Sequence, residues 1–196
     1  FTIQTHYAAI NHFFEMNDIT LKTKKIRRFL PENESKHNNR PYSIPEIQQL
    51  LDKADIRSKV IILLLASTGM RVGAIPGLII SDLKYIDEFG LYLIWVYNNS
   101  RKDRYYTFCT PECADAIKAY LEYRERLGEQ IKEDSSPVIR NFISIDNPFT
   151  TKTSRPISVR TVQDIIIKLQ RQAGLCDNNN NNVMLCHGFR KAYITT

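Results

Sequence analysis

The pattern of hydrophobic and polar positions changes its period along the chain, and it opens in a helical rhythm. Residues 2–14 carry apolar side chains at the spacing of an amphipathic helix: Ile3, Tyr7, Ile10 and Phe14. A second short helical piece is expected over residues 21–30. The apolar periodicity stops across residues 31–41, where two prolines stand among polar residues. We therefore expect a domain boundary here, between a small unit of residues 1–40 and a larger unit of residues 41–196.

The larger unit is expected to be mainly helical, because polar capping residues precede most of its apolar runs. The expected helix starts are Ser43 with Glu46 in a capping box, Asp55, Thr110 with Pro111, and Ser158. The second of these helices is apolar on nearly all sides and should be buried, and Gly69 should end it. A short helix is expected over residues 70–78, with Arg71 in its first turn and Pro76 limiting its length. The last helix should open at His187.

Between residues 82 and 108 the period changes to that of β-strands. Residues 91–97 and 105–108 are rich in β-branched and aromatic side chains, and a polar loop that contains Lys102 separates them. A first strand is expected near residues 83–86. The fold class predicted from these patterns is mainly α with a small antiparallel β-sheet, an α+β arrangement.

The charge balance favours a polyanionic partner. The 196 residues include 27 Lys and Arg against 21 Asp and Glu, for a net charge of +6 and a pI near 9.1. Positive side chains gather in residues 22–28 and in the loop at residues 98–104, whereas acids dominate residues 112–133. The side chains expected to contact DNA are Lys22, Lys24, Lys25, Arg27, Arg28, Arg101 and Arg104. Such charge runs are also typical of an ordinary solvated surface, so charge alone assigns no function.

Several classes of protein are disfavoured. The longest apolar run, residues 60–66, is too short to cross a bilayer, so no membrane partner is expected. The cysteines form no Cys-x-x-Cys pair, and we expect reduced thiols in an intracellular, cytoplasmic protein without a structural zinc site: Cys109, Cys113, Cys176 and Cys186. The asparagine-rich residues 177–182 are expected to be a mobile loop or a low-complexity insert.

Four side chains suited to holding a phosphodiester stand far apart in the sequence. Arg71 ends the segment Thr-Gly-Met-Arg, and Lys102 lies in the polar loop between two expected strands. His187 and Arg190 form a His-x-x-Arg segment. An arginine offers paired N–H donors and stays charged at any working pH, so two of them can hold a phosphate from two sides. Each motif alone also has an ordinary interpretation, as a surface arginine after a helix, a solvated lysine or a histidine that caps a helix.

The order and setting of these motifs resemble the tyrosine recombinases of the phage integrase family, most closely their archaeal and archaeal-virus branch. The segments that carry the resemblance are Leu63 to Arg71, Tyr105 to Cys113, and Gly188 to Lys191. It covers residues 41–196, and the N-terminal helices more loosely resemble the end of the family's helical core-binding domain. The resemblance implies an enzyme that cuts and rejoins double-stranded DNA at specific sites, as in integration or excision of a mobile element or in chromosome-dimer resolution. It also implies assembly of a homo-oligomer on DNA, without a metal or other cofactor.

The resemblance also implies roles for single residues. Arg71, His187 and Arg190 would hold the scissile phosphate, and Lys102 would donate the proton that the leaving 5′ oxygen needs. In the family a tyrosine downstream of the His-x-x-Arg segment attacks the phosphorus and forms a 3′-phosphotyrosyl link. We expect this nucleophile to be absent from the chain, which we interpret as truncated before it. The tyrosines near the motifs are not expected to replace it: Tyr105, Tyr106 and Tyr193.

Two departures from the family pattern leave other functions open. Ala74 stands three residues after Arg71, where many members carry an acid, and Lys191 stands where a histidine is common. A DNA-binding protein derived from an integrase but without catalysis is therefore one alternative. A relative of the type IB topoisomerases, which share this chemistry, is another. A product assay separates the two enzymes, because recombination joins two sites whereas relaxation acts on one.

Overall fold

The computed structural model describes residues 3–30, 40–141, 154–175 and 185–195. The chain divides into two compact units, Phe1–Asn38 and Asn39–Thr196. Most of the linker expected over residues 31–41, and all of the asparagine-rich residues 177–182, lie outside the described residues. Among the residues that are described, no helix is both long enough and apolar enough to span a membrane.

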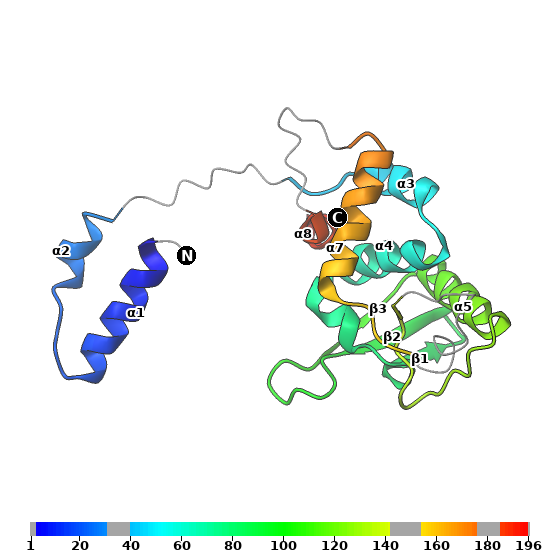
Figure 1. The fold of residues 1–196 in the computed structure, drawn as a ribbon, viewed down its shortest axis with the longest axis horizontal. Coiled ribbons are helices and arrows are strands. Elements are labelled where there is room, and N and C mark those ends of the chain that lie inside the picture. Colours follow the sequence, from blue (N-terminus) through cyan, green and yellow to red (C-terminus); the bar gives the residue numbers. More distant parts are fainter. Residues whose placement is uncertain (1–2, 31–39, 142–153, 176–184, 196) are drawn as a thin grey trace. The chain divides into compact units, whose positions relative to one another are not determined.

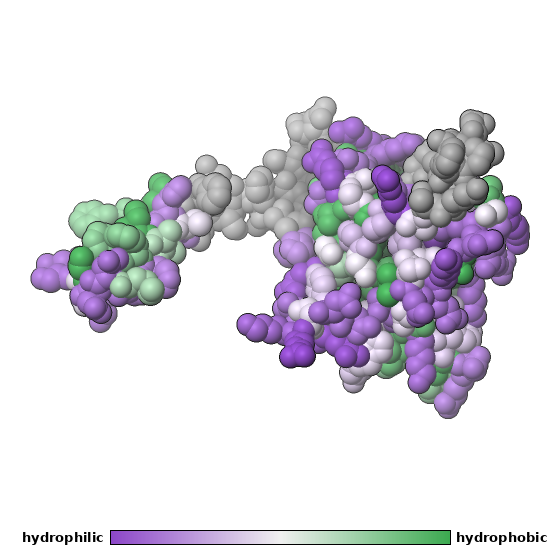
Figure 2. All heavy atoms as spheres, turned by 60° about the horizontal axis from the view of Figure 1, so that its bottom comes forward, coloured by the Kyte–Doolittle hydropathy of each residue, from purple (hydrophilic) through white to green (hydrophobic). Residues whose placement is uncertain are grey.

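The first unit consists of two helices, α1 (Ile3–Met16) and α2 (Thr23–Arg27). The second helix is shorter than the sequence pattern predicts, because residues 28–30 form turns. Neither helix buries a residue, since two short helices cannot enclose a core by themselves. Large apolar side chains are consequently exposed on this unit, and hydrophobic residues gather there in Figure 2: Ile3, Ile10, Phe13, Met16, Ile19 and Phe29.

The second unit is mainly helical, as predicted (Figure 1). Its helices are α3 (Ile44–Lys53), α4 (Ile56–Thr68), α5 (Pro111–Arg126), α7 (Val159–Gln172) and α8 (Leu185–Thr195). Helix α4 contacts α3, α5, α8 and β3, and so forms the centre of the core. It buries side chains around most of its circumference, because nearly every residue from Ile56 to Leu65 that is not charged is apolar: Val60, Ile61, Ile62, Leu64 and Leu65.

The predicted helix starts are confirmed. The Glu46 carboxylate accepts a hydrogen bond from the Ser43 backbone N–H at 2.9 Å, which completes the capping box of α3. The side chains of the other capping residues accept from the third residue of their own helix: Asp55 at 2.7 Å, Thr110 at 3.4 Å and Ser158 at 3.0 Å. Gly69 ends α4 in the left-handed conformation, with φ of 60°.

The short helix expected after α4 is present, but it is a 3₁₀ helix, η1 (Val72–Gly77). Arg71 precedes it in an extended conformation, so the prediction that Arg71 lies in its first turn is wrong. Pro76 lacks a backbone N–H and the flanking glycines disfavour helix, so a continuous α-helix is unfavourable here. A second 3₁₀ turn, η2 (Ile80–Asp82), leads into the sheet.

The sheet has the three antiparallel strands that the sequence predicts, in the order β1-β2-β3. They are β1 (Leu83–Ile86), β2 (Leu91–Val96) and β3 (Tyr105–Phe108). Tyr105 pairs with Val96, so the loop that carries Lys102 joins the paired ends of two strands. Ile94, Val96 and Thr107 are buried on the face that packs against the helices.

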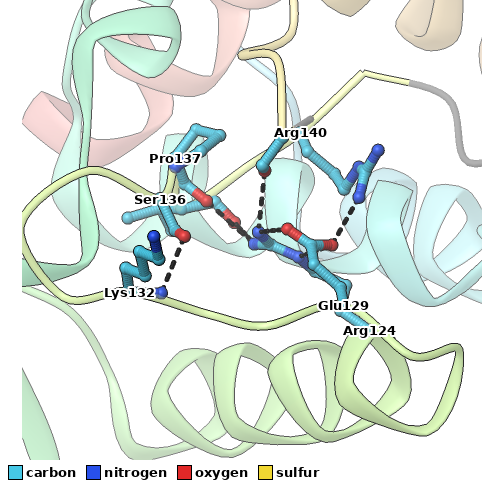
Figure 3. Close-up of polar contacts among 8 residues, drawn as sticks. Arg124, Glu129, Lys132, Ser136, Pro137 and Arg140 are labelled. Carbon is cyan, nitrogen blue, oxygen red and sulfur yellow. Dashed lines mark hydrogen bonds and ion pairs between the residues drawn. The ribbon is translucent and has the colours of Figure 1, made fainter. Parts of the chain in front are cut away.

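A network of buried charges joins the end of α5 to the segment that follows it (Figure 3). Arg124 donates to both carboxylate oxygens of Glu129, from Nε at 3.0 Å and from Nη2 at 2.6 Å. Its Nη1 donates to the backbone carbonyls of Pro137 and Val138. Arg140 donates from Nη1 to Glu129 Oε2 at 2.5 Å. This network, called the Glu129 network below, holds residues 129–140 against the helical core.

Candidate active site

A cleft of about 380 Å³ lies where the end of α4, strand β3 and helix α8 meet. Its walls come from three segments that are far apart in the sequence, around residues 68–71, 105–107 and 190–194. Arg71 and Arg190 both line it, so the structure brings two of the predicted phosphate-binding residues together. A larger hollow of about 530 Å³ between α1 and α2 in the first unit contains none of the four predicted catalytic residues.

Arg190 is tied directly to the segment that carries Arg71. Its Nη1 donates a hydrogen bond of 2.8 Å to the backbone carbonyl of Gly69, two residues before Arg71. The left-handed turn at Gly69 separates the helical backbone of α4 from the extended backbone at Arg71. This hydrogen bond therefore fixes the guanidinium of Arg190 beside the part of the chain that places Arg71.

The Arg71 side chain is exposed, and its guanidinium makes no hydrogen bond with the described residues. Ala74, which stands where many family members carry an acid, is a buried residue of η1 with 2% of its surface exposed. The methyl group of Ala74 cannot accept a hydrogen bond from Arg71. Arg71 is thus available to a ligand but lacks the support of a carboxylate at position 74.

Tyr105 lines the same cleft as the two arginines, close enough for their charges to act on its phenol. Burial raises the pKa of its phenol, the neighbouring Tyr97 acts in the same direction, and the positive charges of Arg190 and Arg71 oppose both effects. The Tyr105 hydroxyl oxygen is buried and has no hydrogen-bond partner of good geometry among the described residues. The sequence pattern identifies this tyrosine only as an ordinary strand residue, and the packing of β3 against α8 reveals its position.

Tyr193 also lines the cleft, although the sequence pattern placed it on the packing face of its helix. Its ring lies over Gly69, where an added Cβ would be 2.5 Å from Tyr193 Cδ1. The side chain is nevertheless 49% exposed. Tyr106 is also among the residues that line the cleft, and its ring packs edge-on against Trp95, with ring centroids 5.5 Å apart.

Lys102 and His187 are not among the residues that line the cleft. Lys102 is exposed in the loop between β2 and β3, which extends from the sheet in Figure 1. At the start of this loop, Asn98 donates a 2.8 Å hydrogen bond to the buried Asp82 carboxylate. His187 is exposed in the first turn of α8, one turn before Arg190. The structure therefore unites the two arginines and leaves the lysine and the histidine outside the cleft.

The residues predicted to contact DNA are all on the surface. In the same loop, Arg101 is exposed and the Arg104 guanidinium lies 4.2 Å from the centre of the Trp95 ring. The predicted DNA-contacting residues of the first unit are also exposed, in and around α2: Lys22, Lys24, Lys25, Arg27 and Arg28. Each of these side chains can reach a partner without a change in the backbone.

Within the described parts of the chain, no three His, Cys, Asp or Glu side chains cluster as metal ligands would. Cys109, Cys113 and Cys186 are free and buried, and Cys176 lies outside the described residues. A hydrogen bond from Cys113 lowers the pKa of the Cys109 thiol to about 7, and burial raises the pKa of Cys186 to about 11. The Cys109 sulfur also accepts a hydrogen bond from the Tyr92 backbone N–H. Cys109 thus links β2 to the segment between β3 and α5, and it does not line the cleft.

The fold is similar to those of several solved recombinases. The XerA recombinase structure has a TM-score of 0.58 and 20% identity over 96% of this chain and 57% of that chain. The XerH site-specific recombinase bound to palindromic difH substrate, a post-cleavage complex, has a TM-score of 0.61 and 17% identity over 90% of this chain and 46% of that chain. A lambda integrase tetramer bound to a Holliday junction has a TM-score of 0.59 and 15% identity over 98% of this chain and 51% of that chain. The chain thus spans about half the length of these proteins.

The predicted fold class is confirmed by these likenesses, since each neighbour shares the helical domain with its small sheet. No curated protein matches the sequence. Residues 40–196 match the phage integrase family, and this match includes every segment that lines the cleft. The chain therefore belongs to the phage integrase family.

Proposed function

We propose that this chain binds double-stranded DNA and holds the scissile phosphate in a site-specific tyrosine recombinase. The observation that carries the proposal is that Arg71 and Arg190 line one cleft. Arg190 is held there by its hydrogen bond to the carbonyl of Gly69, two residues before Arg71. When a phosphodiester is attacked, negative charge grows on its non-bridging oxygens, and donors fixed beforehand stabilise that charge most. Two guanidiniums held at one cleft supply such donors.

In this proposal Lys102 and His187 act at the edge of the cleft. Lys102 protonates the leaving 5′ oxygen, a role suited to a lysine on a loop that projects from the sheet. His187, one turn before Arg190 on α8, contacts the phosphate from a further side. Because both side chains are exposed, rotation about side-chain bonds can bring them to a DNA backbone that occupies the cleft.

We further propose that the attacking tyrosine lies outside these 196 residues. Tyr105 is a poor nucleophile because burial raises its pKa, and Tyr106 packs against Trp95 on the other face of the sheet. The Tyr193 ring lies over Gly69, which holds it as part of the cleft wall. The chain covers about half of the recombinases it resembles, so a large part of each of those proteins has no counterpart in these residues.

The partners proposed for this chain are duplex DNA and further copies of itself. The lambda integrase neighbours include a dimer bound to a core site and a tetramer bound to a Holliday junction, which favours assembly on DNA. The first unit, with its basic residues around α2, would add contacts to DNA phosphates, as the family's core-binding domain does. An intracellular, DNA-associated protein of the archaeal branch fits the segment from Tyr105 to Cys113 that carries this part of the resemblance.

A second candidate function is DNA binding without catalysis. Ala74 favours it, because Arg71 then lacks the buried carboxylate that would fix its guanidinium for chemistry. Such a protein would still occupy DNA through the same cleft. Binding alone does not separate the two candidates, whereas formation of a covalent protein–DNA link by the complete gene product does.

The proposal is tested by DNA binding at a series of salt concentrations. For every phosphate that a variant no longer neutralises, the slope of log affinity against log salt should become shallower by about 0.9. We expect Arg71→Ala and Arg190→Ala each to weaken binding of duplex DNA and to reduce this slope. Arg126→Ala removes an exposed arginine of α5 outside the cleft and serves as the matched control. Affinity that does not respond to salt, or equal slopes in all three variants, would refute the proposed phosphate site.

A further inference from the structure

Tyr105 begins strand β3 on the face of the sheet that packs against α4. Thr107, two residues later on the same face, is buried and donates to the Thr68 carbonyl at 3.4 Å. The phenol of Tyr105 therefore enters the cleft wall beside the end of α4. Tyr106 lies on the opposite face of the strand, because successive strand residues alternate.

The hydroxyl group of Tyr105 is an unusual element of this wall. Its oxygen is buried and no described residue forms a hydrogen bond of good geometry with it. Buried polar groups in folded proteins nearly always have a partner, and an unpaired one destabilises the fold. An unpaired hydroxyl at a cleft is therefore a position where a ligand can supply the missing partner.

The neighbours of this hydroxyl define the chemistry of that ligand. Arg190 and Arg71 are close enough for their charges, and in the case of Arg190 its N–H donors, to lower the pKa of the Tyr105 phenol. A guanidinium has N–H donors and no acceptor, so neither arginine can accept the phenol proton. Burial has the larger effect and raises the pKa, which keeps the proton on the oxygen at neutral pH. The missing partner is thus an acceptor, and one that two positive charges attract.

We propose that the Tyr105 hydroxyl donates a hydrogen bond to a non-bridging oxygen of the bound phosphodiester, as a third donor beside Arg71 and Arg190. This inference rests on the proposed function and adds a catalytic residue to it. The phenol does not attack phosphorus. It shares with the two arginines the negative charge that develops on the same group of oxygens.

The experiment uses the chain with ¹³C at the Cζ atom of every tyrosine and a thymidine dinucleotide, which contains a single phosphodiester, as the probe. In an NMR titration we expect the Tyr105 resonance to shift with the bound fraction. Tyr120 provides an internal reference, because its hydroxyl is also buried without a partner among the described residues but lies on α5 outside the cleft. Its resonance should not move.

Affinity measurements then separate this inference from the function on which it rests. Tyr105→Phe should weaken binding of the dinucleotide roughly tenfold, as expected when one hydrogen bond to a charged group is removed. Tyr120→Phe should bind as the unmodified chain does. If Arg71→Ala and Arg190→Ala weaken binding while Tyr105→Phe binds within twofold and the Tyr105 resonance stays in place, the inference about Tyr105 is overturned and the proposed function stands. If neither arginine variant weakens binding, the phosphate site itself is overturned.

Discussion

The Glu129 network makes a quantitative prediction about stability. Glu129→Gln removes the negative charge that lies between two buried guanidiniums, and the side chains of Glu129 and Arg124 are at most 1% exposed. Removing one partner of a buried ion pair costs about 3–5 kcal/mol, because the remaining charge is left without compensation. We expect the free energy of unfolding of the second unit to fall by that amount at pH 7.

The pH dependence gives a second measure of the same quantity. Burial raises the pKa of the Glu129 carboxyl, but hydrogen bonds from Arg124 and Arg140 outweigh it and lower the pKa from 4.5 to about 2. Because the folded state has the lower pKa, this stabilisation is fully present above about pH 4.5 and is lost as the pH falls toward 2. At about 1.4 kcal/mol per pH unit, the lowered pKa corresponds to roughly 3 kcal/mol.

Urea denaturation followed by the fluorescence of Trp95, the only tryptophan, measures this effect in the second unit. The difference between the unmodified chain and Glu129→Gln should be about 3–5 kcal/mol at pH 7 and should shrink at pH 3. The control is Glu122→Gln, which breaks an exposed ion pair with Arg126 on α5, the helix that carries Arg124. Arg126 is 78% exposed, so this change should lower the free energy of unfolding by less than about 1 kcal/mol. A decrease below about 1 kcal/mol for Glu129→Gln, or a decrease that is the same at both pH values, would contradict the reasoning.

Two further predictions concern the cleft. Gly69→Ala should lower the free energy of unfolding by more than Gly128→Ala, as measured by urea denaturation. Both positions have positive φ, 60° and 86°, but only an alanine at 69 would meet the Tyr193 ring, so equal decreases would contradict the packing described here. In the complete gene product, Lys102→Ala should abolish the covalent protein–DNA link seen on denaturing gels. A substrate with sulfur in place of the bridging 5′ oxygen should restore it, because a thiolate leaves without a proton, and absence of rescue would remove Lys102 from the role of acid.

The fold was largely predictable because its signals are local. Asp55, Thr110 and Ser158 each satisfy a backbone N–H within the next helical turn, so a few consecutive residues suffice to identify the cap. The alternation of residues 91–97 likewise predicts a strand from neighbouring positions alone. The short helix at residues 72–77 was predicted, but its 3₁₀ geometry was not, because Pro76 shortens a helix without indicating which kind of helix forms.

The site was predictable only in part, since contacts between distant segments determine it. Arg71 and Arg190 could be paired because each has a recognisable motif, whereas nothing near Tyr105 in the sequence indicates an unpaired hydroxyl beside two arginines. The Glu129 network could not be predicted either, because it also depends on contacts between segments that are distant in the sequence. Glu129 stands in the acidic stretch of residues 112–133, and its burial depends on the return of Arg140 to the end of α5.

The hydrogen bond from Arg190 to the Gly69 carbonyl joins two residues that the ribosome makes at different times. The two residues are 121 positions apart. At a synthesis rate of about 5–20 residues per second, Arg190 is made roughly 6–24 s after Gly69. During that interval the segment that carries Arg71 lacks this hydrogen bond, and α4 lacks its contact with α8. Under the proposed function, an unfinished polypeptide on the ribosome should bind DNA only weakly until α8 has packed against α4, because one arginine cannot hold a phosphate from two sides.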